Sequence, residues 1–301
     1  MTFVTVLAKQ ERVPTLRDSQ TAQLDVRQTC RQALFEMDKN LLIGMPTLIE
    51  LNSFHDNLVL CKKLKLNLLE INMNLPQFQI DELRNIEEIE EISLSIHLPE
   101  ELNVWDFNNI VRKAYLETIK EVIDIAYNKN IAFLNMHMNP GIYFTLPNVK
   151  IFLFEKYKEK FMENTIFFIE EMKRLLAGTN LKFSIENTGI YNYQYIQDAL
   201  NELLKSNFFE LTWDIGHDYK SNNTDSPFLF ENFDRIRHLH MHDAFNNGRD
   251  HLPLGNGKID FKNIISLTKD KIKSIVLETK TIKGIQKSIS YFNNELLNLF
   301  V

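Results

Sequence analysis

The sequence predicts an α/β protein folded as a (β/α)₈ barrel, the TIM-barrel architecture, preceded by an N-terminal extension. From Leu41 onward, a short apolar run is followed by a longer segment with helical spacing, and this unit repeats eight times. Alternating strands and helices imply a parallel sheet with right-handed crossovers. No second block of different composition follows, and 301 residues are an ordinary length for a chain with one barrel.

Each expected strand is a short, mostly apolar run, and each expected helix has apolar residues three or four positions apart. The strands are expected at residues 41–45, 67–71, 92–96, 131–136, 182–185, 210–213, 238–241 and 274–277. The helical segments are expected at 53–65, 80–90, 107–129, 149–178, 192–206, 227–234, 260–270 and 283–300. The apolar stripe of the 149–178 segment suits either the core or a subunit contact, which would make the protein a homo-oligomer.

An open, doubly wound sheet is the competing architecture. The turn after the first strand, "GMPTLIEL" from Gly44, lacks the G-x-G-x-x-G pattern that binds a dinucleotide. The later "LGNGK", which ends at Lys258, lacks the full spacing of a phosphate-binding loop and a following Ser or Thr. We therefore interpret "LGNGK" as a turn and expect no nucleotide cofactor.

The composition excludes several classes of function. The net charge of −6 provides no general basic field for a polyanion, so nucleic acid is disfavoured as a partner. Cys30 and Cys61 have no metal-type spacing and indicate no disulfide framework, which fits a reducing cytoplasm. No apolar run approaches the roughly 20 residues of a membrane span, so we expect a cytoplasmic protein with no membrane partner.

Residues 1–40 differ from the rest of the chain because they are polar and only weakly periodic. Met37 lies just before the first clear strand. The stretch is therefore either a non-native segment upstream of a native start at Met37, or a genuine N-terminal arm or helix. The barrel domain is expected to span residues 41–301 in both cases.

Six successive strands end in a side chain that can bind a metal. These residues are His97, His137, Glu186, Asp214, His240 and Glu278. In a barrel of this kind the carboxyl ends of the strands converge on one mouth, where the chemistry takes place. Imidazole nitrogens and carboxylate oxygens are ligands for Zn²⁺, Mn²⁺, Co²⁺ and Mg²⁺. The sequence therefore predicts a divalent-metal site at this mouth.

The stretch "HLHMHD" places His238, His240 and His242 on the same face of a strand. We predict that His240 is the ligand, that His242 and Asp243 lie at the rim, and that His238 lies deeper with a structural role. In the alternative, His242 is the ligand and His240 supports it. Glu70 and Asn72 on the second strand are either substrate contacts or structural residues.

Five motifs in register carry a family resemblance: "SIENTG", "WDIGH", "HLHMHD", "DHLPLGNGKIDF" and "VLETK". With them, the chain from Leu41 onward resembles the xylose-isomerase-like barrel superfamily of sugar phosphate isomerases and epimerases, which includes nucleases of the endonuclease IV type. The resemblance implies a single divalent ion held by Glu186, Asp214, His240 and Glu278. It also implies that Glu186 and Glu278 transfer protons next to a carbonyl, through a metal-stabilised enediolate of a small carbohydrate.

The same resemblance leaves a nuclease alternative open. His97, His137, His217 and His251 match positions that, together with the four core ligands, hold three zinc ions in the nucleases. His217 also resembles a substrate- or metal-contacting residue of the sugar enzymes. However, Arg249 stands where the nuclease pattern has an aspartate ligand.

The predicted mouth loops favour a sugar over DNA. They offer only Arg249 as a cation, whereas a DNA enzyme needs several to neutralise phosphates. They also supply aromatic side chains that could stack on a sugar: Tyr143, Phe144, Tyr191, Tyr193 and Phe245. The sequence therefore favours an isomerase or epimerase over a zinc-dependent abasic-site endonuclease.

Overall fold

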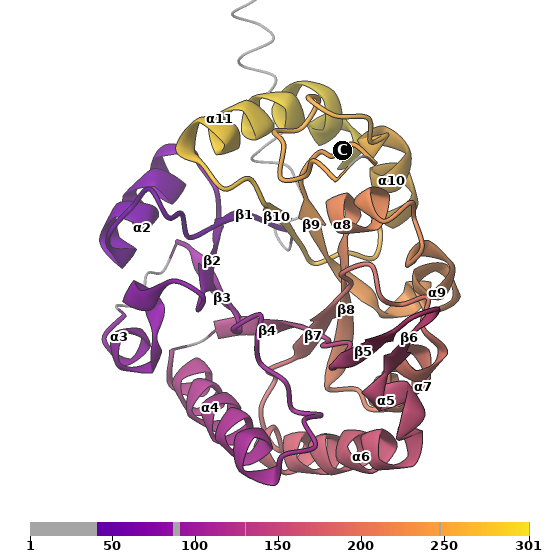
Figure 1. Cartoon of the computed structure of the whole chain (residues 1–301). Helices are drawn as coiled ribbons and strands as arrows, with labels where there is room; N and C mark the ends of the chain where they lie inside the picture. Colours follow the sequence, from indigo (N-terminus) through magenta and orange to yellow (C-terminus); the bar gives the residue numbers. More distant parts are fainter. Residues whose placement is uncertain (1–40, 87–90, 130, 247, 301) are drawn as a thin grey trace, which may run out of the picture.

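The strands close into a barrel that the helices surround (Figure 1). The computed structural model describes residues 41–86, 91–129, 131–246 and 248–300. Eight parallel strands follow one another in the order β1-β10-β9-β8-β7-β4-β3-β2, and β1 (Leu42–Pro46) pairs with β10 (Ser274–Leu277) to complete the ring. This closure confirms the predicted (β/α)₈ barrel and excludes the open sheet.

All eight predicted strands are present, with ends shifted by at most two residues. The remaining six are β2 (Leu68–Asn72), β3 (Ser93–His97), β4 (Ile131–His137), β7 (Phe183–Glu186), β8 (Phe209–Asp214) and β9 (Ile236–Met241). Every residue of β7 and β8 is buried. Helices cover one face of these strands and the barrel interior lies on the other, so both faces are buried although the sequences "FSIE" and "FELTWD" alternate apolar and polar residues.

The helices alternate with the strands along the chain. They are α2 (Phe54–Lys63), α3 (Ile80–Arg84), α4 (Asn109–Asn128), α5 (Leu153–Lys156), α6 (Lys158–Leu175), α7 (Gln194–Leu204), α8 (Ile215–Lys220), α9 (Ser226–Glu231), α10 (Phe261–Thr268) and α11 (Ile282–Tyr291). Ser53, Asn108 and Thr281 cap α2, α4 and α11 by accepting a hydrogen bond from a backbone N–H in the first turn. Shorter turns lie at Pro76–Phe78, Phe233–Arg235, Phe292–Leu296 and Leu297–Phe300.

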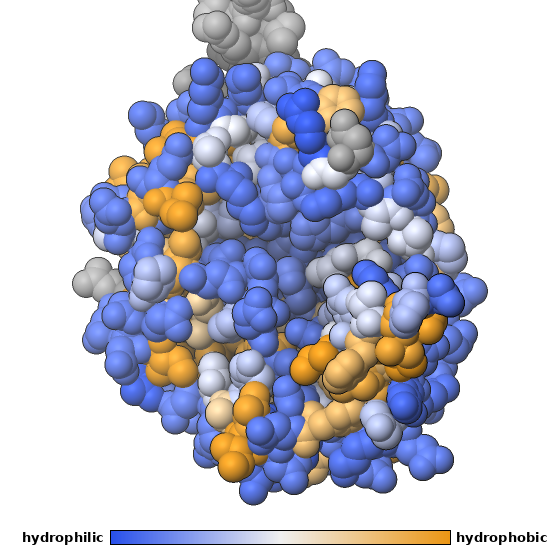
Figure 2. All heavy atoms as spheres, viewed as in Figure 1, coloured by the Kyte–Doolittle hydropathy of each residue, from blue (hydrophilic) through white to orange (hydrophobic). Residues whose placement is uncertain are grey.

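One predicted helix begins in the wrong place. Residues 149–152 were expected to start the long helix of 149–178, but Val149–Phe152 forms β6, which pairs antiparallel with β5 (Tyr143–Leu146). Aromatic and β-branched residues on both sides of Pro147 and Asn148 favour such a hairpin. The exposed apolar side chains of β5 and β6 form the group of orange residues at the lower right of Figure 2.

Other predictions lie outside the described residues. They are the N-terminal extension with Cys30 and Met37, and the 87–90 end of the helix expected at 80–90. Among the residues that the structure does describe, no helix has the length and apolar character needed to cross a membrane.

Tight packing fixes the strands around the barrel axis. A Cβ on Gly44 would lie 2.4 Å from the carbonyl oxygen of Leu68, so β1 and β2 approach each other as closely as they do only because residue 44 is glycine. Outside the barrel, the buried ring of Trp105 contacts Phe168 of α6, with ring centroids 5.9 Å apart. A rigid barrel of this kind holds the ends of its strands in fixed positions.

Candidate metal centre

Four side chains from four adjacent strands converge at one end of the barrel. Glu186 and Asp214 end β7 and β8, His240 lies near the end of β9, and Glu278 follows β10. One potential ligand atom from each lies within 4.8 Å of the other three, and all four residues are buried. The structure therefore brings together the four residues that the family resemblance implies as metal ligands.

Some of these polar atoms are buried without a hydrogen-bond partner. They include Oε1 of Glu186 and Oδ2 of Asp214. A buried carboxylate oxygen without a partner is costly, and a divalent cation would satisfy it. Because carboxylates and imidazoles are also the donor set that such cations prefer, the residues present fit a divalent ion.

The charges in this cluster compensate one another. Burial disfavours the charged form of Glu186, but the imidazoles of His240 and His137 outweigh it and hold the pKa of this carboxyl well below its ordinary value. Burial also disfavours a charged His240, but the carboxylates of Glu186 and Glu70 raise the pKa of this imidazole well above its ordinary value. A bound cation would replace the proton on His240 as the counter-charge.

Glu186 is held in place from behind. The side-chain amide of Asn135 donates a hydrogen bond to Oε2 of Glu186. Oδ1 of Asn135 accepts from Oγ1 of Thr212 at 2.9 Å, and this hydroxyl lies 2.6 Å from that of Ser184. The sequence offered only a weak signal for Asn135, a polar residue inside an apolar strand.

Asp214 is fixed by its own helix and by a neighbouring loop. Its Oδ1 accepts a hydrogen bond of 2.6 Å from the backbone N–H of His217, which makes Asp214 the N-cap of α8. The side chain of Asn187 accepts from the backbone N–H of Asp214 at 2.8 Å and donates to its carbonyl at 3.0 Å. The motifs "WDIGH" and "SIENTG" are therefore joined by hydrogen bonds between the side chain of Asn187 and the backbone of Asp214.

A second group that could hold an ion shares Glu186. It consists of Glu186, His97 and His137. Nε2 of His97 lies 3.5 Å from Oε2 of Glu186, and Nε2 of His137 lies 3.4 Å from Oε1. Nδ1 of His97 lies 2.8 Å from the carbonyl oxygen of Leu98, to which it can only donate, so Nε2, which faces Glu186, is the ring nitrogen left for an ion. Burial opposes the charged form of His97, but Glu186 raises the pKa of this imidazole to about 9.

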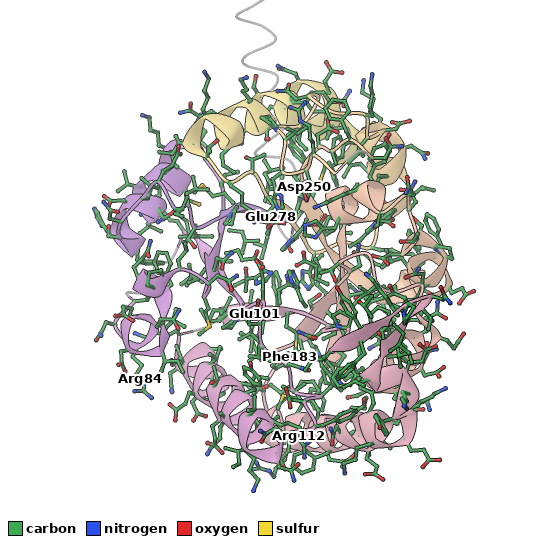
Figure 3. All side chains as sticks on the ribbon, in the orientation of Figure 1. Arg84, Glu101, Arg112, Phe183, Asp250 and Glu278 are labelled. Carbon is green, nitrogen blue, oxygen red and sulfur yellow. The ribbon has the colours of Figure 1, made fainter. Side chains whose placement is uncertain are left out.

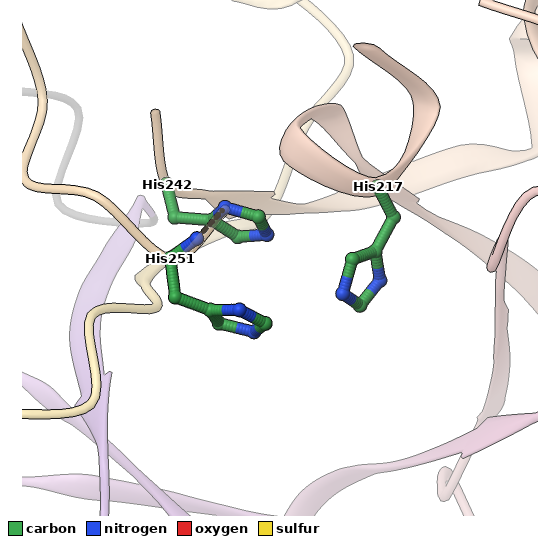
Figure 4. A group of neighbouring side chains, drawn as sticks. All are labelled: His217, His242 and His251. Carbon is green, nitrogen blue, oxygen red and sulfur yellow. Dashed lines mark hydrogen bonds between the residues drawn. The ribbon is translucent and has the colours of Figure 1, made fainter. Parts of the chain in front are cut away.

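A third group consists of three imidazoles, from His217, His242 and His251 (Figure 4). The rings of His242 and His251 stack with centroids 4.2 Å apart, and the backbone N–H of His251 donates to Nδ1 of His242 at 2.9 Å. Nε2 of His242 lies 3.2 Å from Oδ1 of Asp214. His242, which we predicted at the rim, is fully buried beside the four-residue centre.

His238 lies deeper in the barrel, as the sequence predicts. Its Nδ1 lies 2.8 Å from the hydroxyl of Ser274, and its Nε2 lies 3.3 Å from Oε2 of Glu210. The ring stacks on Phe133 with centroids 3.8 Å apart. These contacts satisfy both ring nitrogens and give His238 a structural role.

The cations near the site include one that the sequence did not single out. Lys280 pairs with Oε1 of Glu278. Burial disfavours the charged form of Glu278, but Lys280 and His240 outweigh it and hold the pKa of this carboxyl well below its ordinary value. The guanidinium of Arg249 lies 5.5 Å from the ring centroid of Phe245. Figure 3 shows Glu278 and Asp250 inside the ring of helices, whereas Arg84 lies on its outer side.

One predicted sugar contact is wrong. Tyr191 is fully buried, and its hydroxyl donates to the carbonyl oxygen of Ile185 at 3.2 Å. Its ring packs against Phe228 with centroids 5.4 Å apart. Tyr143 and Phe144 are exposed on β5 instead.

Comparison with known proteins agrees with this architecture. The chain is 27% identical over 209 residues to the uncharacterized protein MJ1614 of Methanocaldococcus jannaschii. The matched region covers 66% of this chain and 76% of that protein. It resembles the crystal structure of a D-tagatose 3-epimerase-like protein with a TM-score of 0.66 and 24% identity, over 85% of this chain and 98% of the other.

It also resembles the IOLI protein, whose crystal structure has a bound zinc atom, with a TM-score of 0.63 and 13% identity, over 84% of this chain and 97% of that one. The model of the xylose isomerase-like TIM barrel family matches residues 58–295. That span contains all four residues of the centre, and the chain belongs to the xylose isomerase-like TIM barrel family.

Proposed function

We propose that this protein is a divalent-metal-dependent isomerase or epimerase of a small sugar or sugar phosphate. The observation that carries the proposal is the buried convergence of Glu186, Asp214, His240 and Glu278. A similar structure is named as a D-tagatose 3-epimerase-like protein and another contains zinc, which supports the substrate class and the metal. The ion would be Mn²⁺, Co²⁺, Mg²⁺ or Zn²⁺.

In the proposed reaction Glu186 and Glu278 exchange protons with the carbon next to the substrate carbonyl. A divalent cation, when bound, supplies the positive charge that makes this C–H bond acidic enough for a carboxylate base. The neighbouring cationic groups outweigh the opposing effect of burial and keep both glutamates ionised, so each can accept a proton from the substrate carbon and return it. Asn135 holds Glu186, and Lys280 holds Glu278, at fixed positions during the transfer.

Exchange with heavy water tests this chemistry without knowledge of the exact sugar. We would load the protein with each of the four ions and incubate it in D₂O with a panel of free and phosphorylated ketoses and aldoses. Proton NMR should show deuterium entering the carbon next to the carbonyl of the true substrate and of its isomer. A metal-loaded, folded protein that exchanges no carbon-bound proton on any sugar would contradict the proposal.

Glu186→Gln and Glu278→Gln should each lower the exchange rate by at least ~100-fold while the protein stays folded, because an amide cannot transfer the proton. Glu202→Gln is the matched control, since Glu202 pairs with Lys205 on the surface. Circular dichroism should show the same fold for all three variants. Full activity in either of the first two variants would remove the proton-transfer role of that glutamate.

A second candidate function, zinc-dependent hydrolysis of abasic-site DNA, is favoured by one observation. Three groups that could hold ions lie next to one another, and two of them share Glu186. Several ions could activate water and bind a phosphate together. Elemental analysis of the purified protein distinguishes the two, because the sugar enzyme should hold one ion per chain and the nuclease three. Nicking of abasic-site DNA that a chelator abolishes would favour the nuclease.

A further inference from the structure

Glu70 is a buried carboxylate that neither the proton transfer nor the four-residue centre uses. It lies in β2, paired in register with Ser95 of β3, and is 1% exposed. Strand β2 is not a neighbour of β9 in the barrel, so Glu70 meets His240 across the interior. Its Oε1 lies 3.3 Å from Nε2 of His240, while the hydroxyl of Ser95 lies 3.4 Å from Oε2.

The two nitrogens of His240 face different groups. Nδ1 lies 3.2 Å from Oε2 of Glu186 and 3.1 Å from Oε2 of Glu278, on the side of the centre. Nε2 is buried and, among the described residues, has Glu70 as its only ion-pair contact. Once a cation replaces one of its two ring protons, the imidazole is neutral and carries a single proton, which a carboxylate at Nε2 keeps there, leaving the lone pair on Nδ1.

We infer that Glu70 is a positioning residue that fixes the tautomer of His240, so that Nδ1 is the atom presented to the metal. The inference rests on the metal centre of the proposed function. It goes further because it assigns the ligand atom and gives a reason for burying a carboxylate on β2, three strands away from β9 around the barrel. A carboxylate behind a ligating histidine also orients the ring and makes it a stronger base.

The barrel contains a second pair of the same type, which serves as an internal control. Oε2 of Glu210 on β8 lies 3.3 Å from Nε2 of His238 on β9. His238 precedes His240 by two residues on the same strand, and neither Glu210 nor His238 belongs to the four-residue centre. Both pairs join a buried carboxylate to the Nε2 of a buried imidazole. Only the pair of Glu70 and His240 should influence metal binding.

The test measures the affinity for Zn²⁺ and Mn²⁺ by calorimetric titration of the chelator-treated full chain. Glu70→Met should weaken binding ~10–100-fold, the usual effect of removing such a partner. Glu70→Gln should retain part of the affinity, because its amide oxygen can still accept a hydrogen bond from Nε2–H of His240. Glu210→Gln should stay within about threefold of the wild type. Circular dichroism confirms that each variant is folded before titration.

A second measurement reports the tautomer directly and needs no activity. In zinc-loaded protein labelled with ¹⁵N-histidine, two-bond ¹H–¹⁵N spectra should show His240 protonated at Nε2 and metal-bound at Nδ1, with His240→Asn used for assignment. Metal bound at Nε2, or a folded Glu70→Met variant with wild-type affinity, overturns the inference while the metal centre stands. A wild-type chain that binds no divalent ion overturns both the inference and the proposed metal dependence.

Discussion

Single residues in the barrel interior combine in histidine–carboxylate pairs, and the location of each pair decides its role. His238 and Glu210 satisfy each other in the lower part of the interior, far enough from the mouth to serve the fold alone. His240 has carboxylates at both nitrogens, which is what a ligand with an orienting partner requires. The same two residue types are therefore structural in one layer and suited to chemistry in the next.

The ionised side chain of Glu210 should make the free energy of unfolding fall as the pH becomes acidic. Burial disfavours its charged form, but His238 and Lys273 outweigh this and lower the pKa of Glu210 from 4.5 to about 2. Between these two pH values the unfolded chain takes up a proton that the folded chain refuses, so the stabilisation is complete above pH 4.5 and is lost as the pH falls toward 2.

Urea unfolding from pH 7 to pH 3 checks this expectation. Glu210→Gln should lower the free energy of unfolding by about 1–3 kcal/mol at pH 7. The difference from the wild type should shrink below pH 4.5. Glu202→Gln, a surface control, should show a difference near zero throughout. A constant difference for Glu210→Gln across the whole range would mean that the ion pair is not its cause.

At the scale of the elements, α8 and the end of β9 form one packed unit. A Cβ on Gly216 in α8 would lie only 2.0 Å from Cε1 of His242, so the helix accepts this ring only because residue 216 is glycine. The ring in turn contacts the Asp214 carboxylate and receives the N–H of His251. Gly216 therefore sets the position of an imidazole that contacts Asp214 of the four-residue centre.

Gly216→Ala should displace His242 and lower metal affinity by roughly tenfold, in addition to the ~1–3 kcal/mol of stability that overpacking costs. Gly178→Ala is the control, because Gly178 has a φ of +79° and no neighbour within 4 Å of an added Cβ. It should cost about 1 kcal/mol through backbone strain and leave metal affinity unchanged. Equal affinities in calorimetric titrations of the two variants would contradict the role of Gly216.

Some of the strands and helices were predictable from the sequence and others were not. The eight strands were predictable because burial on both faces leaves short apolar runs, such as the one in β10. The β5–β6 hairpin was not, because its exposed aromatic and β-branched residues also fit a helical spacing. The convergence of strand ends on one mouth was predictable from the barrel, whereas the choice of Glu186, Asp214, His240 and Glu278 among the six candidates came from the family resemblance.

The partners of these four residues were harder to predict. Asn135 and Glu70 each appear in the sequence as one polar residue in an apolar strand, and nothing there indicates which strand faces them across the barrel. The burial of His242 and Tyr191 was also missed, because a residue after a strand can lie at the rim or turn inward with its loop. The position of a residue along its strand can be read from the local sequence. The side chains that it contacts across the interior depend on how all eight strands close into the barrel.

For the whole molecule, metal binding should add stability to a protein that is already folded. At a free ion concentration 100 times the dissociation constant, the gain is ~2.7 kcal/mol. Differential scanning calorimetry should therefore show the melting temperature rising by several degrees with the preferred ion and falling again with a chelator. The quadruple variant in which each of the four core residues becomes Ala should show no such rise. Unfolding of the wild type by chelator at room temperature would contradict this expectation.

The ion pairs around Glu186 and Glu278 are present before any metal binds. The His240 imidazole, whose pKa is raised by its carboxylate neighbours against the effect of burial, and the ammonium group of Lys280 lie against the carboxylates at the mouth of the barrel. A chain arranged in this way can finish folding before it meets any ion. Which ion it carries would then be decided by the supply in its surroundings after synthesis, and could change when that supply changes.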